Sequence, residues 1–448
     1  MLVKGIRGAG KTLWWEALLD GHLRALIEAV SPRMGINAAT RCSAGFGAGP
    51  RPLDYPDSDT LVDLVRQGID PRHIWRAVIA LHVLTEEESA EFLELQRWSQ
   101  RVAWMTVDSE RRALAFYRAD QRLAQRGETY LVLFDALDRT ASDWPMLRNL
   151  LRGLLQVLLE FRSYRAIRPK VFVRPDMLDD PEVKSFPDAS KVIDSAVALT
   201  WPRRELYGLL WQYLGNAPES AAFRDDCQRG FGQVWQLRGD GVWLMPQGMR
   251  QDEELQRRLF DAIAGPWMGI DARRGFPYTW LPNHLGDADQ QTSPRSFVAA
   301  LRMAAETSAD YHRRYPDYPY ALHYEALKRG VQLASAIRVE EIREDYPWVA
   351  HLMQALAGLT VPIPFQDIEA RWQQNGTIET IGSSLEGTRA RLPPRRIQQG
   401  APGLREDLTE LGVLQPVAAG RINIPDVYRV GFGLGRRGGV RPVGVERT

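Results

Sequence analysis

Gly5-Ile6-Arg7-Gly8-Ala9-Gly10-Lys11-Thr12 is the stretch that decides the fold, because it fits the pattern G-x-x-x-x-G-K-[ST] of a phosphate-binding loop. Glycine lets the backbone curl so that successive N–H groups point at phosphate oxygens, and the helix expected from Leu13 to about Asp20 aims its positive end at the same anion. We predict that Lys11 contacts the β- and γ-phosphates and that the Thr12 hydroxyl binds Mg²⁺. The predicted nucleotide-binding residues of the loop are Gly5, Arg7, Gly8, Ala9, Gly10, Lys11, Thr12 and Leu13.

The scarcity of lysine favours this interpretation over a glycine-rich turn that fits the pattern by accident. The chain has 51 arginines and six lysines, and lysine is kept where a compact ammonium suits a site better than a forked guanidinium. The strand that leads into the loop, residues 1–4, is short for a central parallel strand. This shortness indicates that the chain starts late or once followed another domain.

The overall composition is that of a globular protein with room for about two or three domains. The chain has 448 residues, 44% of them hydrophobic, and its net charge of +1 gives no global attraction to nucleic acid or membrane. Its two cysteines, Cys42 and Cys227, suit a reducing compartment. No apolar run reaches the roughly 18 residues that would span a bilayer. We therefore expect a cytoplasmic protein without a membrane partner.

A second motif is the apolar run of residues 130–135, Tyr-Leu-Val-Leu-Phe-Asp, which is typical of a buried parallel strand. At the carboxyl end of such a strand Asp135 is expected to lie beside the phosphate loop and to hold Mg²⁺ through water; the alternative is a turn-forming aspartate. Ala136 stands where a catalytic glutamate is common. Asp138 is then the nearest candidate to polarise the attacking water, and hydrolysis is expected to be slow. The alternative for Asp138 is an ion pair with Arg139.

A further strand is predicted over residues 170–176, Lys-Val-Phe-Val-Arg-Pro-Asp. Arg174, at the end of this strand, is placed to sense the γ-phosphate. The alternative is an ion pair between Arg174 and Asp176 or Asp179, and the sequence does not decide between them.

Strands and helices alternate through the first part of the chain, with a last strand expected over residues 196–200. This alternation specifies a parallel sheet with helices on both faces, so residues 1–201 are predicted to form an α/β P-loop NTPase core. Residues 40–58, rich in Gly, Pro, Ala and Ser, are predicted to be an exposed loop. The leucines of the helix expected over residues 144–164 have helical spacing and are assigned to the core.

Residues 202–335 are predicted to form a helical lid, with an irregular stretch over residues 216–250. Ser293-Pro294-Arg295 is expected to start a helix, since serine is a natural N-cap and proline fits the first helical position. A cation in the first turn opposes the helix dipole, so Arg295 is expected to face an anion. The alternative for Arg295 is a solvent-exposed side chain.

Residues 336–430 have the pattern of a winged-helix domain, with helices followed by a hairpin, and residues 431–448 are predicted to be a basic flexible tail. The helices are predicted over residues 345–359, 365–373 and 402–411, and the hairpin over residues 414–424. The third helix carries Glu406, Asp407 and Glu410 against Arg405, which disfavours DNA as its partner because DNA phosphates would be repelled. The basic linker over residues 382–400 and the tail retain a possible nucleic-acid contact, but a protein partner or self-association is favoured.

These motifs, in this order, resemble those of the bacterial STAND/KAP-like P-loop ATPases, AAA-type ATPases with a C-terminal winged helix that are often suspected in signalling or antiviral defence. The resemblance implies that Arg174 is a sensor, that residues 293–295 lie in the lid, and that the winged helix closes over bound nucleotide. The resulting expectation is a slowly hydrolysing switch that binds ATP and Mg²⁺. The alternatives are a DNA-associated motor or loader anchored by the winged helix, and a scaffold that binds nucleotide without hydrolysing it. GTP is not excluded, since no base-reading motif is evident.

Overall fold

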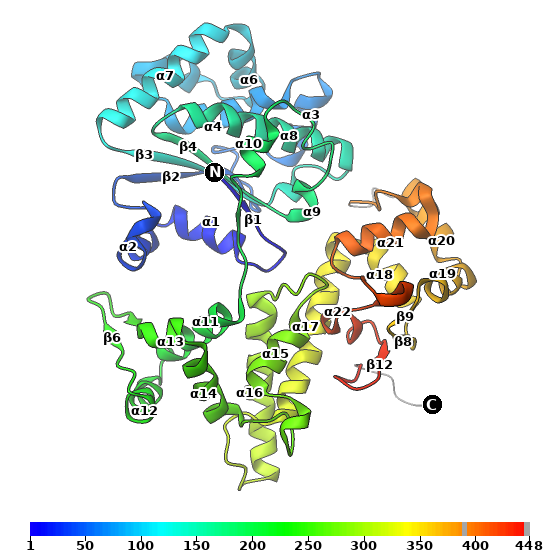
Figure 1. Cartoon of the computed structure of the whole chain (residues 1–448). Coiled ribbons are helices and arrows are strands. Elements are labelled where there is room, and N and C mark those ends of the chain that lie inside the picture. The colour runs from blue at the N-terminus through cyan, green and yellow to red at the C-terminus, as the bar shows by residue number, and fades with distance from the viewer. Residues whose placement is uncertain (388–391, 443–448) are drawn as a thin grey trace. The chain divides into compact units, whose positions relative to one another are not determined.

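The computed structural model describes residues 1–387 and 392–442 (Figure 1). The chain divides into two compact units. We call them the N-terminal unit (Met1–Leu199 with Arg389–Leu392) and the C-terminal unit (Thr200–Thr388 with Pro393–Thr448). None of the helices within residues 1–387 and 392–442 is both long and apolar enough to cross a membrane.

The N-terminal unit is built on a five-stranded sheet in the order β2-β3-β4-β1-β5, in which every pairing is parallel. This confirms the predicted α/β fold class. The strands are β1 (Leu2–Lys4), β2 (Thr40–Phe46), β3 (Thr129–Phe134), β4 (Ile167–Val173) and β5 (Val197–Ala198). The helices of this unit are α1 (Lys11–Leu19), α2 (Gly21–Val30), α3 (Ser58–Arg66), α4 (Pro71–Val83), α5 (Glu86–Glu94), α6 (Trp98–Val107), α7 (Ser109–Gln125), α8 (Trp144–Glu160), α9 (Pro175–Leu178) and α10 (Ala189–Ile193).

The helices cover both faces of the sheet: α1 and α2 lie on one side, and α4 and α8 lie on the other (Figure 1). On the second side Trp75 of α4 packs edge-on against Phe46 and Phe134, with ring centroids 6.2 and 5.6 Å away. The Trp75 indole also donates a hydrogen bond to the Leu150 carbonyl of α8, at 2.9 Å. The leucines of α8 that were assigned to the core are buried, which confirms the assignment: Leu147, Leu150, Leu151, Leu154, Leu155 and Leu158.

The prediction of an exposed loop over residues 40–58 was wrong at its start, because residues 40–46 form β2, an edge strand paired with β3. The small residues that suggested a loop have a packing reason. A Cβ atom on Gly45 would lie 2.6 Å from the Phe134 ring, so only glycine lets β2 approach β3 at this point.

The C-terminal unit begins with helices that form the lid, in which α16 and α17 pack along each other over most of their length (Figure 1). These helices are α11 (Arg203–Gly215), α12 (Ala221–Phe231), α13 (Gln247–Gln251), α14 (Glu253–Ala264), α15 (Pro277–Leu285), α16 (Pro294–Arg314) and α17 (Tyr324–Asp345). The stretch over residues 216–250 is less irregular than predicted, since it contains α12, α13 and a hairpin of β6 (Gln236–Leu237) and β7 (Trp243–Leu244). The expected boundary at residue 335 falls inside α17.

The following residues form the winged-helix arrangement of helices and a small antiparallel sheet, as predicted. The helices are α18 (Pro347–Gln354), α19 (Phe365–Gln374), α20 (Thr377–Gly387) and α21 (Gly400–Glu410). The sheet has the order β10-β11-β9, from β9 (Ile363–Pro364), β10 (Gln415–Val417) and β11 (Arg421–Asn423). The helix expected over residues 345–359 is shorter than predicted, because Asp345 still belongs to α17 and Pro347 starts a new helix.

The prediction of a flexible tail was wrong for residues 431–442, because these residues pack into the C-terminal unit. After α22 (Asp426–Arg429), β12 (Gly435–Arg436) pairs in parallel with β8 (Thr360–Val361). Leu434 and Val440 are 0% and 2% exposed. Arginines and glycines surround these two apolar residues in the sequence. The composition of the segment is therefore that of a flexible tail, although its apolar side chains are buried. Residues 443–448 lie outside the described part of the chain.

Candidate functional site

The phosphate loop connects β1 to α1 and is held at the carboxyl edge of the sheet. The Gly5 N–H donates a hydrogen bond to the Val173 carbonyl of β4 at 3.1 Å, so the loop leaves the sheet between neighbouring strand ends. Gly8 and Gly10 have φ angles of 77° and 96°, in the left-handed region that glycine adopts without strain. Helix α1 starts at Lys11, so its positive end opens onto the loop.

Lys11 lies folded over this loop. Its ammonium group donates hydrogen bonds to the carbonyl oxygens of Gly5 and Ile6, at 2.8 and 3.0 Å. The pKa of Lys11 is lowered to about 8, mainly by burial and then by the positive charge of Arg174. The ammonium is thus held by neutral carbonyls, which are weaker partners than phosphate oxygens.

This environment predicts that nucleotide affinity falls as the pH rises above about 8. Bound phosphates would raise the pKa of Lys11, so binding above pH 8 requires the uptake of up to one proton, whereas binding well below pH 8 does not. Calorimetric titration of ATP at pH 7 and pH 9, in buffers with different heats of ionisation, measures this uptake. Lys11→Arg is the control, because a guanidinium stays protonated at both pH values. Equal proton uptake at the two pH values would contradict the prediction.

Thr12 and Asp135 meet as the two motifs require, although they are far apart in the sequence. The Thr12 hydroxyl donates a hydrogen bond to the Asp135 carboxylate at 2.7 Å, and Asp135 is 2% exposed. Burial raises the pKa of Asp135, and the hydrogen bond from Thr12 opposes that shift. Because the Thr12 hydroxyl donates its proton to Asp135, its oxygen keeps lone pairs for a metal ion, and the carboxylate can accept hydrogen bonds from metal-bound water. The pair therefore fits the Mg²⁺ ion that the motif implies.

The Asp135 backbone is anchored by the strand that sequence analysis missed. Its N–H donates a hydrogen bond to the Phe46 carbonyl at the end of β2, at 3.0 Å. The signal that could have revealed β2 is the alternation of Cys42, Ala44 and Phe46 with Arg41, Ser43 and Gly45, which the glycines that follow obscured.

Arg174 lies directly beside the phosphate loop, because Lys4 of β1 pairs with Val173 of β4. Its guanidinium forms an ion pair with Asp176 at 2.8 Å, which is one of the two alternatives that the sequence left open. A second carboxylate, Asp138, lies 3.7 Å from the same guanidinium. Arg174 is therefore held between two carboxylates, 8% exposed, at the edge of the loop.

Asp138, the candidate for orienting water, lies in a short 3-10 helix, Leu137–Arg139, directly after β3. Its ion pair is with Arg174, whereas Arg139 donates a hydrogen bond to the Ala48 carbonyl at 3.4 Å. The charges of Asp138, Asp135 and Asp176 all act to raise the pKa of Lys11, which places these carboxylates around the ammonium. The structure thus gathers Lys11, Thr12, Asp135, Asp138 and Arg174 at one edge of the sheet.

Arg295 belongs to the C-terminal unit, in the first turn of α16. It faces an anion, as its position in the helix predicts, but that anion is the carboxylate of Glu341 in α17, at 2.5 Å. Arg338 of α17 shares the same carboxylate at 3.2 Å. Helix α16 begins with Pro294 after Ser293, as expected. Within this unit the charge of Arg295 is paired with a carboxylate of the same chain.

These features define the class of fold: a P-loop NTPase sheet followed by a helical lid and a C-terminal winged helix. No protein-family model matches the chain, and no curated protein matches it. The solved structures to which the chain is similar include the following three. They are the ORC1 protein of Aeropyrum pernix in complex with DNA (13% identity, 95% of this chain and 82% of that chain, TM-score 0.33), the ORC2 protein of Aeropyrum pernix with ADPNP and ADP (12%, 95% and 83%, TM-score 0.32) and CDC6P of Pyrobaculum aerophilum (13%, 95% and 83%, TM-score 0.27).

Proposed function

We propose that this chain is a cytoplasmic P-loop ATPase that works as a slowly hydrolysing switch. The observation that carries the proposal is the meeting of Thr12 and Asp135 at 2.7 Å beside the Lys11 ammonium. ATP would lie against residues 5–13, with Mg²⁺ held by Thr12 directly and by Asp135 through water. The metal would neutralise charge that develops on the phosphates.

The chain's own residues position the phosphates and the attacking water, and they supply charge that stabilises the phosphates. Lys11 exchanges two carbonyl partners for phosphate oxygens, and the loop N–H groups hold the phosphates in line. Asp138 orients the attacking water, but it does so from an ion pair with Arg174 at 3.7 Å. This ion pair holds the carboxylate beside Arg174 rather than beside the water that it would orient, which supports a slow reaction.

The switch would consist of two arrangements that differ in contacts to the γ-phosphate. We propose that Arg174 exchanges Asp176 for the γ-phosphate in one of them, and that Arg295 exchanges Glu341 for a phosphate when the lid closes. The resemblance to STAND/KAP-like ATPases supports a role in signalling or defence, with a protein partner or self-association as the output.

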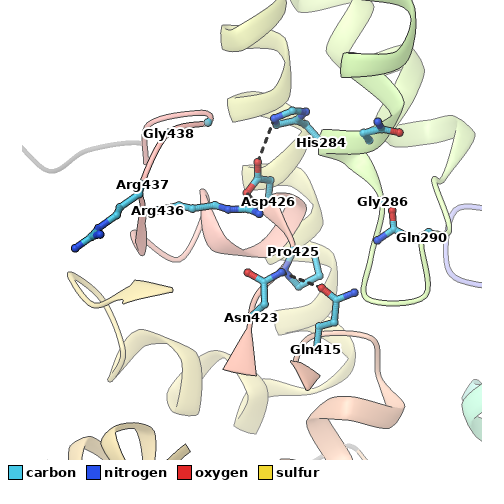
Figure 2. Close-up of a pocket in the computed structure, with 12 residues that line it drawn as sticks. His284, Gly286, Gln290, Gln415, Asn423, Pro425, Asp426, Arg436, Arg437 and Gly438 are labelled. Carbon is cyan, nitrogen blue, oxygen red and sulfur yellow. Dashed lines mark hydrogen bonds and ion pairs between the residues drawn. The ribbon is translucent and has the colours of Figure 1, made fainter. Parts of the chain in front are cut away.

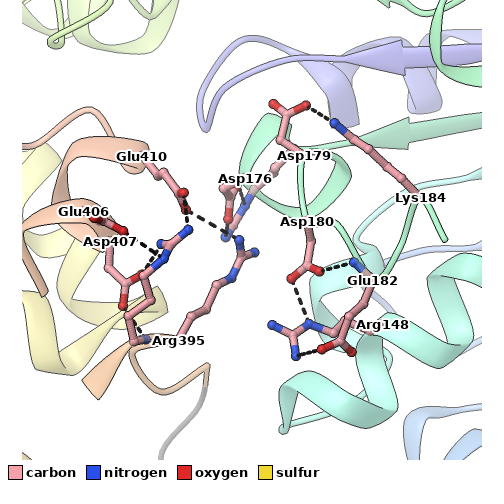
Figure 3. A network of polar contacts seen from close by, with 12 residues as sticks. Arg148, Asp176, Asp179, Asp180, Glu182, Lys184, Arg395, Glu406, Asp407 and Glu410 are labelled. Atoms are coloured by element: carbon pink, nitrogen blue, oxygen red, sulfur yellow. Dashed lines mark hydrogen bonds and ion pairs between the residues drawn. The ribbon is translucent and has the colours of Figure 1, made fainter. Parts of the chain in front are cut away.

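A DNA-associated motor or loader is the second candidate, and one observation favours it. Arg396 pairs with Asp407 at 2.6 Å and with Glu410 at 2.5 Å. The acidic side of α21, on which Figure 3 shows Asp407 and Glu410, therefore repels phosphates less than its sequence suggests. The same ion pairs occupy Arg396, which is a cation of the basic linker. A second cation of the linker, Arg395, lies 3.7 Å from Glu410. The linker's Arg389 and Arg391 lie outside the described residues.

We expect the purified full chain to release phosphate slowly from Mg²⁺–ATP, at a rate that duplex DNA does not change. Asp138→Ala should lower this rate by roughly 10²-fold while ATP binding persists, because it removes the group that orients water. Asp179→Ala is the matched control, since that aspartate pairs with Lys184 at 2.9 Å and is exposed. Stimulation by DNA at low salt would favour the motor or loader. Full activity of Asp138→Ala would contradict the role of Asp138, and binding without turnover would leave a scaffold.

A further inference from the structure

A polar pocket of about 470 Å³ lies in the C-terminal unit, and no residue of the phosphate loop lines it. Its walls are the end of α15, the β10–β11 hairpin, the start of α22 and the segment after β12 (Figure 2). This volume lies within the range of sites that enclose small molecules.

One side of the pocket offers hydrogen-bond donors. Gly438 and Gly439 have φ angles of 79° and 83°, and in the described part of the chain no hydrogen bond engages their backbone N–H groups. Backbone N–H groups that lack a partner can donate hydrogen bonds to an anion. Arg436 points into the same space, with its guanidinium 3.5 Å from Asp426 (Figure 2).

The opposite side offers acceptors. The Asn423 side-chain oxygen is buried and has no hydrogen-bond partner, while its amide group donates to Gln415 at 2.8 Å. The Nδ1 atom of His284 lies 2.8 Å from the Trp280 carbonyl, which can only accept, so Nδ1 carries the proton. In the neutral ring Nε2 is then an acceptor, and it lies 3.6 Å from the Asp426 carboxylate.

The charge of the pocket is positive. Asp426 is neutralised by Arg429, which is 0% exposed and contacts it at 2.7 Å. This leaves the charges of Arg436 and of Arg437, whose exposed side chain points away from the other lining residues (Figure 2). A ligand that suits the pocket is therefore an anion that also carries donor groups.

We propose that this pocket binds a small phosphate monoester that bears hydroxyl groups, as a sugar phosphate does. The phosphate group lies against Arg436 and the N–H groups of Gly438 and Gly439. The hydroxyl groups donate to the Asn423 oxygen and to His284 Nε2, which gives the buried acceptor of Asn423 the partner that it lacks. This site is independent of the nucleotide site in the N-terminal unit.

Calorimetric titration of the full chain with ribose 5-phosphate tests the proposal. We expect binding at one site in Lys11→Ala as in the unmodified chain, because the phosphate loop is not involved. Arg436→Ala and Asn423→Asp should each weaken binding by about tenfold or more, the first by removing a charge-assisted hydrogen bond and the second by placing a carboxylate beside the ligand. Arg441→Ala is the matched control, since Arg441 follows the lining residue Gly439 closely in the sequence but does not line the pocket.

Three results would overturn the assignment. No binding at millimolar ribose 5-phosphate would exclude a site for this class of ligand. Binding that is lost in Lys11→Ala and kept in Arg436→Ala would place the ligand in the phosphate loop. Equal affinity for inorganic phosphate, or full affinity in Asn423→Asp, would show that the acceptor side does not hold hydroxyl groups.

Discussion

Replacing Lys11 by alanine should lower Mg²⁺–ATP turnover by roughly 10²-fold or more, because it removes the one ammonium group that the phosphate loop holds over its own carbonyls. ATP binding should weaken as well, since no other side chain of residues 5–12 is a lysine. Phosphate release and calorimetric ATP binding measure the two effects. The fold should survive, because both hydrogen bonds that are lost go to carbonyls of the loop itself and neither goes to a strand of the sheet.

Lys191→Ala is the control for this experiment. Lys191 lies in α10 of the same unit, with its side chain 60% exposed and paired with Asp188 at 3.0 Å. Its loss should change neither turnover nor binding, since exposed ion pairs contribute little. Turnover in Lys11→Ala equal to that of the unmodified chain would mean that the activity does not come from the phosphate loop.

Replacing Arg429 by methionine should destabilise the C-terminal unit by about 3–5 kcal/mol, since it leaves a buried carboxylate without its main counter-ion. Arg429 is fully buried: it contacts Asp426 at 2.7 Å and donates to the carbonyls of Leu434 and Val440 at 2.9 and 2.8 Å. These contacts hold the segment that was expected to be a flexible tail. Native-state hydrogen exchange of peptides over residues 424–436 measures the free energy of local opening.

Two further variants separate charge from packing. Arg436→Met should cost less than about 1 kcal/mol, because Arg436 lies 3.5 Å from Asp426 with a side chain that is 42% exposed. Arg429→Met combined with Asp426→Asn should recover part of the loss, since it removes the unpaired charge. A double variant as unstable as Arg429→Met alone would mean that the lost hydrogen bonds to Leu434 and Val440 dominate.

The phosphate-loop motif and the apolar run that ends in Asp135 were sufficient to predict the fold class and the residues that meet at the sheet edge. Both are local patterns with a direct physical meaning: glycine at left-handed positions, a lysine before a helix, and an acid at the end of a buried strand. Parallel strands end at the same edge, so β3 brings Asp135 to the edge at which β1 enters the phosphate loop, although β4 lies between the two strands.

The partners of the charged residues were not predictable in the same way. Packing between distant segments determines which residues form ion pairs. The pairs are Asp138 with Arg174, Arg295 with Glu341, and Arg396 with Asp407. In an arginine-rich chain, sequence spacing does not show which carboxylate each guanidinium reaches.

The sequence by itself determined the phosphate loop, the parallel sheet and the winged-helix pattern, because these depend on backbone conformation and on periodic burial within one segment. Only the tertiary structure decided that residues 40–46 are a strand and that residues 431–442 are packed. It alone also brought Asn423, His284 and Arg436 around one pocket. Such features depend on what a distant segment offers: the Phe134 ring that requires glycine at position 45, and the Asp426 carboxylate that receives Arg429.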